Sequence, residues 1–151
     1  MASAKKFHSG TVKKQILINA THDKVWKKIS NIVGLPDWID KIKKATYLSK
    51  IKRGVGAIRK LTFDDGNVIE EHVAIWNPKH SFSYIATTGL PLRVYHATLL
   101  IQSKNKKSAY LTWSSYLNSK KMTVKEFKDF VSYLEIFYEK SLRNLKSQLE
   151  S

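Results

Sequence analysis

The chain has 151 residues and no cysteine. This length suits one domain with one core, and the lack of cysteine excludes disulfide frameworks and zinc–thiolate sites. No stretch approaches the ~18 apolar residues of a membrane span, and the N-terminus lacks the apolar core of a signal peptide. We therefore expect a single cytoplasmic domain over residues 1–151, with residues 1–11 as a flexible N-terminal segment.

The formal net charge of +15 raises the question of a polyanionic partner. The basic residues are 23 lysines and 4 arginines, spread along the whole chain. Recognition of phosphates and bases favours arginine, so this composition disfavours nucleic acid. A solvated lysine surface is the favoured interpretation, and contact with an anionic membrane stays an alternative. Nothing in the pattern indicates an oligomeric state.

The N-terminal third predicts one strand followed by two short helices. Residues 12–18 have strand character, and Thr21 is a candidate N-cap for a helix whose apolar residues recur at helical spacing. Gly34 and Pro36 end that helix, and the sequence LPDWI allows about one more helical turn.

The middle of the chain is predicted to form an antiparallel meander. Turn-type segments such as DDGN and NPKH separate six strand-like runs. These runs cover residues 43–51, 57–63, 68–76, 81–87, 93–102 and 109–117. With the first strand, the sequence predicts seven strands.

The C-terminal segment predicts one long helix. Thr123 and Glu126 form a capping box directly before apolar residues that recur every three or four positions as far as Leu149. A helix of this length extends roughly 40 Å, which is enough to cross a sheet. The layout is therefore α+β, with one curved sheet around one helix and room for a ligand between them.

Two charged residues fall within the apolar pattern of the hairpin around DDGN. Strand alternation places Arg59 on the more apolar face of AIRKLTF, and places Glu71 and Ile75 on that of VIEEHVAIW, with Trp76 outward. Without a bulge, Glu71 must lie opposite Arg59 or Leu61, so the two charges form a pair. Because a buried ion pair contributes little to stability, a ligand or proton-transfer role is favoured over an idle pair.

Aromatic and aliphatic residues on inward faces are candidates for the walls of a cavity, although packing in a filled core is the favoured interpretation for any single aromatic. The candidates from the strands and the last helix are Phe82, Tyr84, Tyr95, Trp113, Phe130, Leu134, Phe137 and the small polar Ser141.

Neither a metal nor a cofactor is expected. The five histidines lack the spacing of metal ligands, and His72 and His96 fall on outward faces. The GVGA segment lacks the third glycine of a dinucleotide fingerprint and leads into a strand.

Several segments resemble the START-like or Bet v 1-like superfamily, and within it the polyketide cyclase/dehydrase and lipid-transport-type members. These segments are INATHDKVWKKISNIVGLPDWIDKI, GVGAIRKLTFDDGNVIEEHV, SYIATTGLPLRVYHATLLI and TWSSYL, and the resemblance covers about residues 14–149. It implies a helix-grip fold, in which a seven-stranded antiparallel sheet wraps a long C-terminal helix and two short helices join the first two strands. It also implies a cavity for lipids, sterols, polyketides, hormones or other hydrophobic ligands.

The plant abscisic acid receptors of this superfamily suggest individual site residues. Lys43 is similar to their lysine that meets the ligand carboxylate. Glu71 resembles their glutamate that contacts polar groups of the ligand through water, and Tyr95 resembles a cavity tyrosine. The DDGN turn is too short to match one of their two gating loops.

Three functions are consistent with these observations. The leading hypothesis is binding of a small hydrophobic ligand, which is lipid, polyketide-like or aromatic and could carry an acidic group, with Lys43, Arg59 and Glu71 as polar anchors. The second is a cyclase or dehydratase, a lyase or isomerase in which Arg59 polarises a carbonyl and Glu71, Tyr84 or Tyr95 moves a proton. The third is binding of nucleic acid or an anionic membrane by the basic surface.

Overall fold

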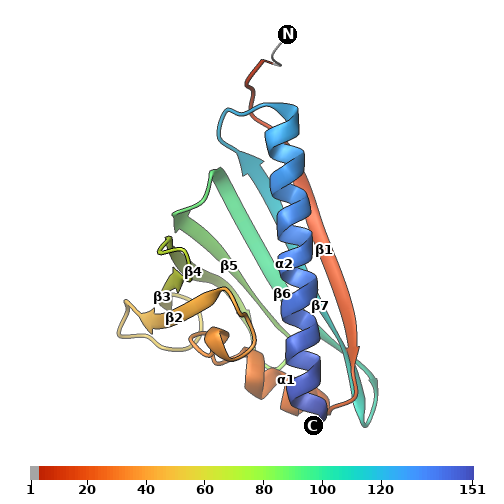
Figure 1. The fold of residues 1–151 in the computed structure, drawn as a ribbon. Coiled ribbons are helices and arrows are strands. Elements are labelled where there is room, and N and C mark those ends of the chain that lie inside the picture. Colours follow the sequence, from red (N-terminus) through yellow and green to blue (C-terminus); the bar gives the residue numbers. More distant parts are fainter. Residues whose placement is uncertain (1–3) are drawn as a thin grey trace.

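The computed structural model describes residues 4–151 as one curved sheet packed against one long helix (Figure 1). The elements in chain order are β1 (Ser9–Ile18), α1 (His22–Ile29), the 3₁₀-helix η1 (Leu35–Asp37), β2 (Ile42–Tyr47), β3 (Ile58–Phe63), β4 (Val68–Asn77), β5 (Ser81–Thr88), β6 (Leu92–Asn105), β7 (Ser108–Ser119) and α2 (Val124–Glu150).

All neighbouring strands are antiparallel, and their order in the sheet is β1-β7-β6-β5-β4-β3-β2. The first strand therefore lies beside the last, and β1 and β2 form the two edges. The long helix α2 lies beside β1, its Tyr138 ring stacks on Trp113 of β7, and the short helix α1 lies near its C-terminal end (Figure 1). This arrangement confirms the predicted α+β helix-grip fold, with its two short helices between the first two strands.

The predicted capping box sets the start of α2. The side-chain oxygen of Thr123 accepts a hydrogen bond from the backbone N–H of Glu126, and a carboxylate oxygen of Glu126 accepts one from the backbone N–H of Thr123, at 3.1 and 2.9 Å. The apolar side of the helix then packs into the core, where Tyr138 and Leu145 are fully buried.

Among residues 4–151, no helix has both the length and the apolar character needed to cross a membrane.

The first strand begins earlier than the sequence predicted. Residues 9–11 lie in β1 and pair with residues 116–118 of β7, and Lys6 forms an isolated bridge with Met122. Residues 9–11, which belong to the segment expected to be flexible, are therefore fixed by backbone pairing with β7. Residues 1–3 lie outside the described part of the chain.

The end of β4 differs from the predicted alternation. A bulge between Val73 and Ile75 inserts an extra residue, which turns Ile75 outward, where it is 54% exposed. Trp76 turns inward instead, and its ring lies 5.2 Å from that of Trp26 and 5.4 Å from that of Phe82. The predicted faces of Ile75 and Trp76 were therefore wrong.

Candidate functional site

A cavity of about 270 Å³ lies between the sheet, α2 and the segment around η1. This volume is close to the lower end of the roughly 300–1,000 Å³ range of small-molecule sites. Eight of the predicted site residues line it: Arg59, Glu71, Tyr84, Tyr95, Trp113, Phe130, Leu134 and Phe137.

Arg59 and Glu71 form a buried ion pair on the wall of the cavity. They lie opposite each other in β3 and β4 and are 3% and 5% exposed. Nε and Nη2 of Arg59 contact the same carboxylate oxygen, Glu71 Oε1, at 2.9 and 2.7 Å. Nη1 donates to the backbone oxygen of Ile32 at 2.8 Å, and the guanidinium lies 4.7 Å from the centre of the Tyr84 ring. These contacts hold the arginine side chain in one position.

The other carboxylate oxygen of Glu71, Oε2, accepts no hydrogen bond from any residue in the range 4–151. Because Glu71 lines the cavity, this oxygen is available to a molecule bound there. Arg59 also keeps N–H groups beyond the three contacts above. The pair as a whole is close to neutral, and it offers a ligand one acceptor and one donor side by side.

Three tyrosine hydroxyls and one indole form a polar cluster next to this pair. Trp113 Nε1 donates to the hydroxyl of Tyr84 at 3.1 Å, and that hydroxyl lies 3.4 Å from the hydroxyl of Tyr95. The hydroxyl of Tyr95 is hydrogen-bonded in turn to that of Tyr138. The Trp113 and Tyr138 rings stack at 3.9 Å. The sequence places Tyr138 on the inward side of the last helix, but nothing in it identifies this hydrogen bond.

Burial shifts the ionisation of these groups toward their neutral forms. It raises the pKa of Glu71 above 4.5, an effect that the positive charge and hydrogen bond of Arg59 oppose. Burial also raises the pKa of Tyr84 well above 10.0, and the negative charge of Glu71 adds to this shift. The pKa values of Tyr95 and Tyr138 are raised by burial first and by neighbouring tyrosines second. At neutral pH the three tyrosines are therefore uncharged hydroxyls.

Lys43 lies outside the cavity, contrary to the expectation from the abscisic acid receptors. Residues Ile42 and Lys44 pair with β3, and the register shifts between them, so Lys43 occupies a bulge. Ile42 faces the cavity, whereas Lys43 and Lys44 are both exposed to solvent. The expectation for Lys43 came from the resemblance to the receptors, and the bulge in β2 is the local feature that accompanies its exposure.

Two other predicted wall residues pack elsewhere. Phe82 is fully buried between Trp26 and Trp76, in the part of the core next to α1. Ser141 is also buried, but its hydroxyl donates to the backbone oxygen of Phe137 at 2.7 Å. Its polar group is satisfied within the helix, so it is not available to a ligand in the cavity.

Sequence reasoning missed the other lining residues, which are Leu35, Ile39, Ile42, Leu61, Phe63, Asp65, Asn67, Ile69, Gly89, Leu90, Pro91 and Tyr133. Leu61 and Ile69 share the strand faces of Arg59 and Glu71, and that alternation could have identified them. The residues in turns carry no such signal.

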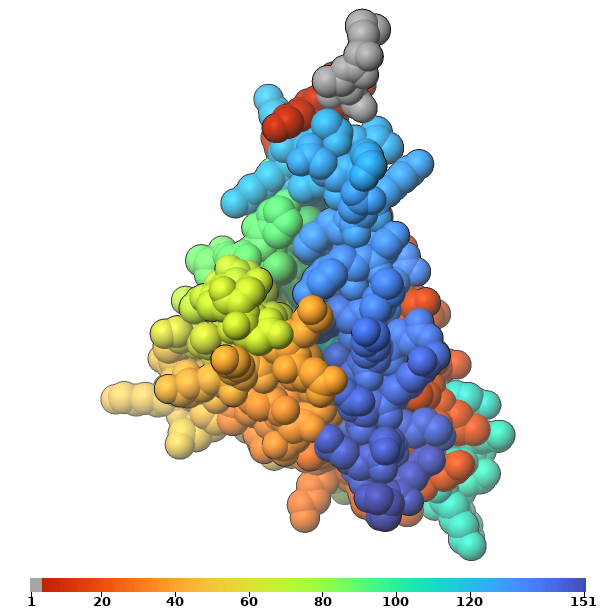
Figure 2. Space-filling model, viewed as in Figure 1, coloured from red at the N-terminus to blue at the C-terminus, as the bar shows by residue number. Residues whose placement is uncertain are grey.

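Two turns form one side of the cavity mouth, and α2 forms the other. The β3–β4 turn and the β5–β6 turn are lime and green in Figure 2, and both face the blue helix. Asn67 Nδ2 donates to the backbone oxygen of Gly89 at 3.0 Å and joins the two turns. Gly89 has a φ of +92°, and a Cβ at this position would lie 2.2 Å from the backbone oxygen of Val68. Only glycine fits this approach without a shift of the backbone.

Comparisons with known proteins agree with this architecture. Residues 9–150 match the profile of the family described as "Polyketide cyclase / dehydrase and lipid transport". No curated protein is significantly similar in sequence.

Solved structures share the fold at low identity. The Zhui aromatase/cyclase from Streptomyces has a TM-score of 0.82 and 15% identity, over 95% of this chain and 94% of that one. An uncharacterized protein from Bacillus thuringiensis has a TM-score of 0.80 and 20% identity, over 94% and 100% of the two chains. Norcoclaurine synthase from Thalictrum flavum, in complex with dopamine and hydroxybenzaldehyde, has a TM-score of 0.73 and 20% identity, over 95% and 87%.

Proposed function

Because the chain belongs to the polyketide cyclase / dehydrase and lipid transport family, we propose that it binds a small, mainly hydrophobic molecule in the cavity between the sheet and α2. The observation that carries this proposal is the Arg59–Glu71 pair, fixed on a wall that is otherwise largely aliphatic and aromatic. An apolar site with a few fixed polar groups is typical of small-molecule binding.

The polar groups favour a neutral ligand with a hydroxyl group and an aromatic or polyketide-like body. Glu71 Oε2 would accept a hydrogen bond from the ligand hydroxyl, and a free N–H of Arg59 would donate to a ligand oxygen. A ligand carboxylate is disfavoured, because the lysine expected to meet it lies outside and the arginine is already neutralised by Glu71. Dopamine and hydroxybenzaldehyde, the molecules in the norcoclaurine synthase structure, are also small phenols.

A matched set of probes tests the ligand class. We expect 2-naphthol to bind more tightly than naphthalene, and 2-naphthoate to bind most weakly, when each is titrated calorimetrically into the full chain. Glu71→Gln should reduce the preference for the naphthol over naphthalene and leave the affinity for naphthalene unchanged. Failure of all three probes to bind the unmodified protein would contradict the proposal.

Cavity-filling variants test the location. Leu134→Trp places a larger side chain in the cavity and should abolish probe binding, whereas Ile136→Trp on the exposed side of the same helix should not. Because overpacking can destabilise a core by about 1–3 kcal/mol, circular dichroism must show that the variants are folded. Ile69→Phe is a second filling variant from the opposite wall. Undiminished binding by both filled variants would place the site elsewhere.

A cyclase or dehydratase activity is the second candidate, and the free Oε2 of Glu71 favours it. A carboxylate with a raised pKa is a stronger general base in its ionised form, and Glu71 would remove a proton from a carbon next to a ligand carbonyl. Arg59 would stabilise the charge that develops on the oxygen of the attacked carbonyl. The test is turnover of a linear polyketone followed by mass spectrometry. Activity that survives Glu71→Gln unchanged would contradict these roles.

A further inference from the structure

The loop between β2 and β3, residues 48–57, exposes three large aliphatic side chains. Leu48 and Ile51 are each 51% exposed and Val55 is 60% exposed, and we call these residues the aliphatic triad. No other segment of comparable length within residues 4–151 exposes as many. Grouped apolar side chains of this kind are typical of an interaction surface.

The base of this loop is hydrogen-bonded to the sheet, so the backbone at both ends of the aliphatic triad is fixed in position. The backbone N–H of Leu48 donates to the backbone oxygen of Ile58 at 2.9 Å, and the N–H of Ile58 donates to Ser49 Oγ at 2.9 Å. On the other arm, the N–H of Gly56 donates to the backbone oxygen of Val73 at 3.3 Å. The loop forms part of the yellow-orange region at the left edge of Figure 2.

Only positive charges accompany the triad. Lys50, Lys52 and Arg53, here called the basic triad, alternate with the aliphatic residues in the loop and are exposed. The wider segment of residues 41–63 has eight lysines and arginines and no aspartate or glutamate. Two members of the basic triad also lie against aromatic rings, Lys52 over Tyr47 at 5.8 Å and Arg53 over Trp76 at 5.6 Å.

We propose that this loop docks on an anionic membrane surface. The aliphatic triad would enter the boundary between headgroups and acyl chains, while the basic triad would contact the anionic headgroups. Nucleic acid fits less well, because it would contact the cations but leave the aliphatic side chains in water, and single strands bind by stacking on aromatic rings. Since β3 follows the loop directly, the proposed membrane contact and Arg59 of the cavity lie on the same β2–β3 hairpin.

Co-sedimentation with lipid vesicles tests the proposal on the full chain. The unmodified protein should bind vesicles of phosphatidylcholine with phosphatidylglycerol more tightly than vesicles of phosphatidylcholine alone. The triple variant Leu48→Ser, Ile51→Ser and Val55→Ser should bind the anionic vesicles at least about tenfold more weakly, because it loses apolar burial. The double variant Lys50→Gln and Lys52→Gln should also lose at least about tenfold, since each cation near such a surface adds roughly fivefold.

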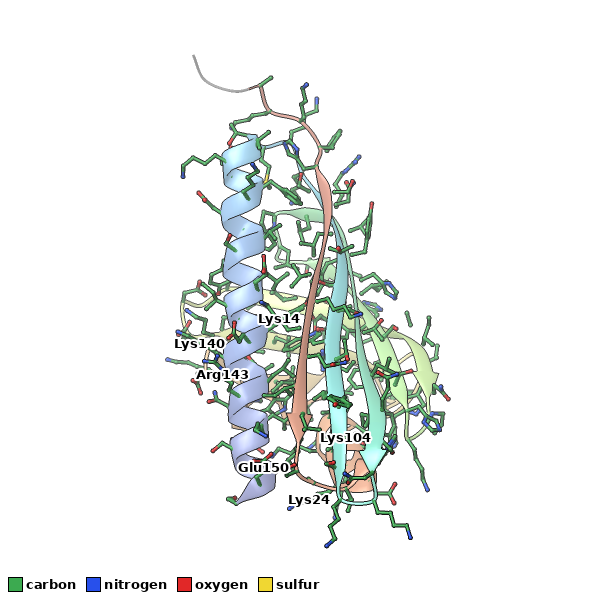
Figure 3. All side chains as sticks on the ribbon, turned by 90° about the vertical axis from the view of Figure 1, so that its right-hand side faces the viewer. Lys14, Lys24, Lys104, Lys140, Arg143 and Glu150 are labelled. Atoms are coloured by element: carbon green, nitrogen blue, oxygen red, sulfur yellow. The ribbon has the colours of Figure 1, made fainter. Side chains whose placement is uncertain are left out.

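Matched controls distinguish vesicle binding by this loop from binding by the overall positive charge of the protein. Lys104 and Lys106 lie on the β6–β7 hairpin, and Lys104 is near the end of the molecule where α2 ends (Figure 3). Their replacement by glutamine removes the same charge as the loop variant and should have less effect on vesicle binding. Replacement of the exposed Ile75, Ile85 and Val94 by serine is the control for the aliphatic triad and should leave binding unchanged.

Three outcomes would overturn the proposal. The first is no binding of anionic vesicles by the unmodified protein. The second is an equal loss in the loop variants and their matched controls, which would assign binding to diffuse charge. The third is duplex DNA binding as tight as vesicle binding and unaffected by the aliphatic substitutions, which would identify a general polyanion surface.

Discussion

Arg59 and Glu71 face each other across β3 and β4, and two nitrogens of the arginine contact one oxygen of the glutamate at 2.9 and 2.7 Å. Both side chains are almost completely buried, at 3% and 5% exposed. Removing two charges from water costs free energy that offsets much of their mutual attraction, so the pair adds little net stability. The loss of one member alone is nevertheless destabilising, because the remaining charge is then buried without a partner.

The first prediction concerns the loss of one partner. Arg59→Met leaves the Glu71 carboxylate buried without a counter-charge and should reduce the free energy of unfolding at neutral pH by about 3 kcal/mol. Replacing both residues with apolar ones, as Arg59→Met with Glu71→Leu, should restore stability to within about 1 kcal/mol of the original. Urea unfolding measures both changes. The control is Asp129→Asn, which breaks the exposed Lys125–Asp129 pair and should have no measurable effect. A double variant less stable than Arg59→Met would contradict this explanation.

The second prediction is the pH dependence that Glu71 creates. Because burial raises the pKa of Glu71 in the folded protein above 4.5, the folded state binds this proton more tightly than the unfolded chain. The corresponding stability is fully present below pH 4.5 and is lost as the pH rises through the raised pKa. The stability of the unmodified protein relative to Glu71→Gln should therefore fall as the pH rises above 4.5 in urea unfolding. A relative stability that grows with pH would mean that Arg59 lowers this pKa instead.

The third prediction concerns the buried tyrosines. Burial raises the pKa values of Tyr84, Tyr95 and Tyr138 in the folded protein, so their contribution to stability is present below pH 10.0 and is lost as the pH rises above it. In an alkaline titration, three of the seven tyrosines should ionise only when the chain unfolds. Tyrosinate absorbance and circular dichroism, measured together, detect this coupled step.

Substitution assigns the step to particular residues. Tyr138→Phe should reduce the absorbance change that accompanies unfolding by one tyrosine, whereas Tyr133→Phe, at a position 46% exposed, should leave it unchanged. The loss of the hydrogen bond between Tyr138 and Tyr95 should also reduce stability by about 1 kcal/mol. Full ionisation of all seven tyrosines in the folded protein would contradict the prediction.

The fourth prediction tests the contact between the two turns at the cavity mouth. Gly89→Ala should destabilise the protein by more than Gly66→Ala, because both positions have positive φ but only the Cβ at residue 89 meets backbone, at 2.2 Å from the oxygen of Val68. Backbone strain alone accounts for about 1–2 kcal/mol at either position. Thermal unfolding measures the difference. Equal losses for the two variants would show that the close contact at Gly89 adds nothing to the strain.

The strand alternation was sufficient to predict the central pair of the site. It placed Arg59 and Glu71 on one face, and the length of the DDGN turn limited their register to two choices, of which the structure adopts the direct one. The same reasoning was wrong for Ile75 and Trp76, because a bulge in β4 adds one residue and reverses the faces beyond it. A bulge depends on the neighbouring strand, and the residues of one strand alone do not indicate it.

Local patterns in the sequence determined the order and type of the elements, since capping residues, turn residues and hydrophobic periodicity act between residues close in the chain. They also determined the α+β class and the presence of an inward charged pair. Only the tertiary structure decided which inward residues border a cavity and which pack in filled core, as Tyr84 and Phe82 do on the same strand face. The physical reason is that a cavity is the space left between elements far apart in sequence, and its volume depends on how α2 and the turns pack against the sheet.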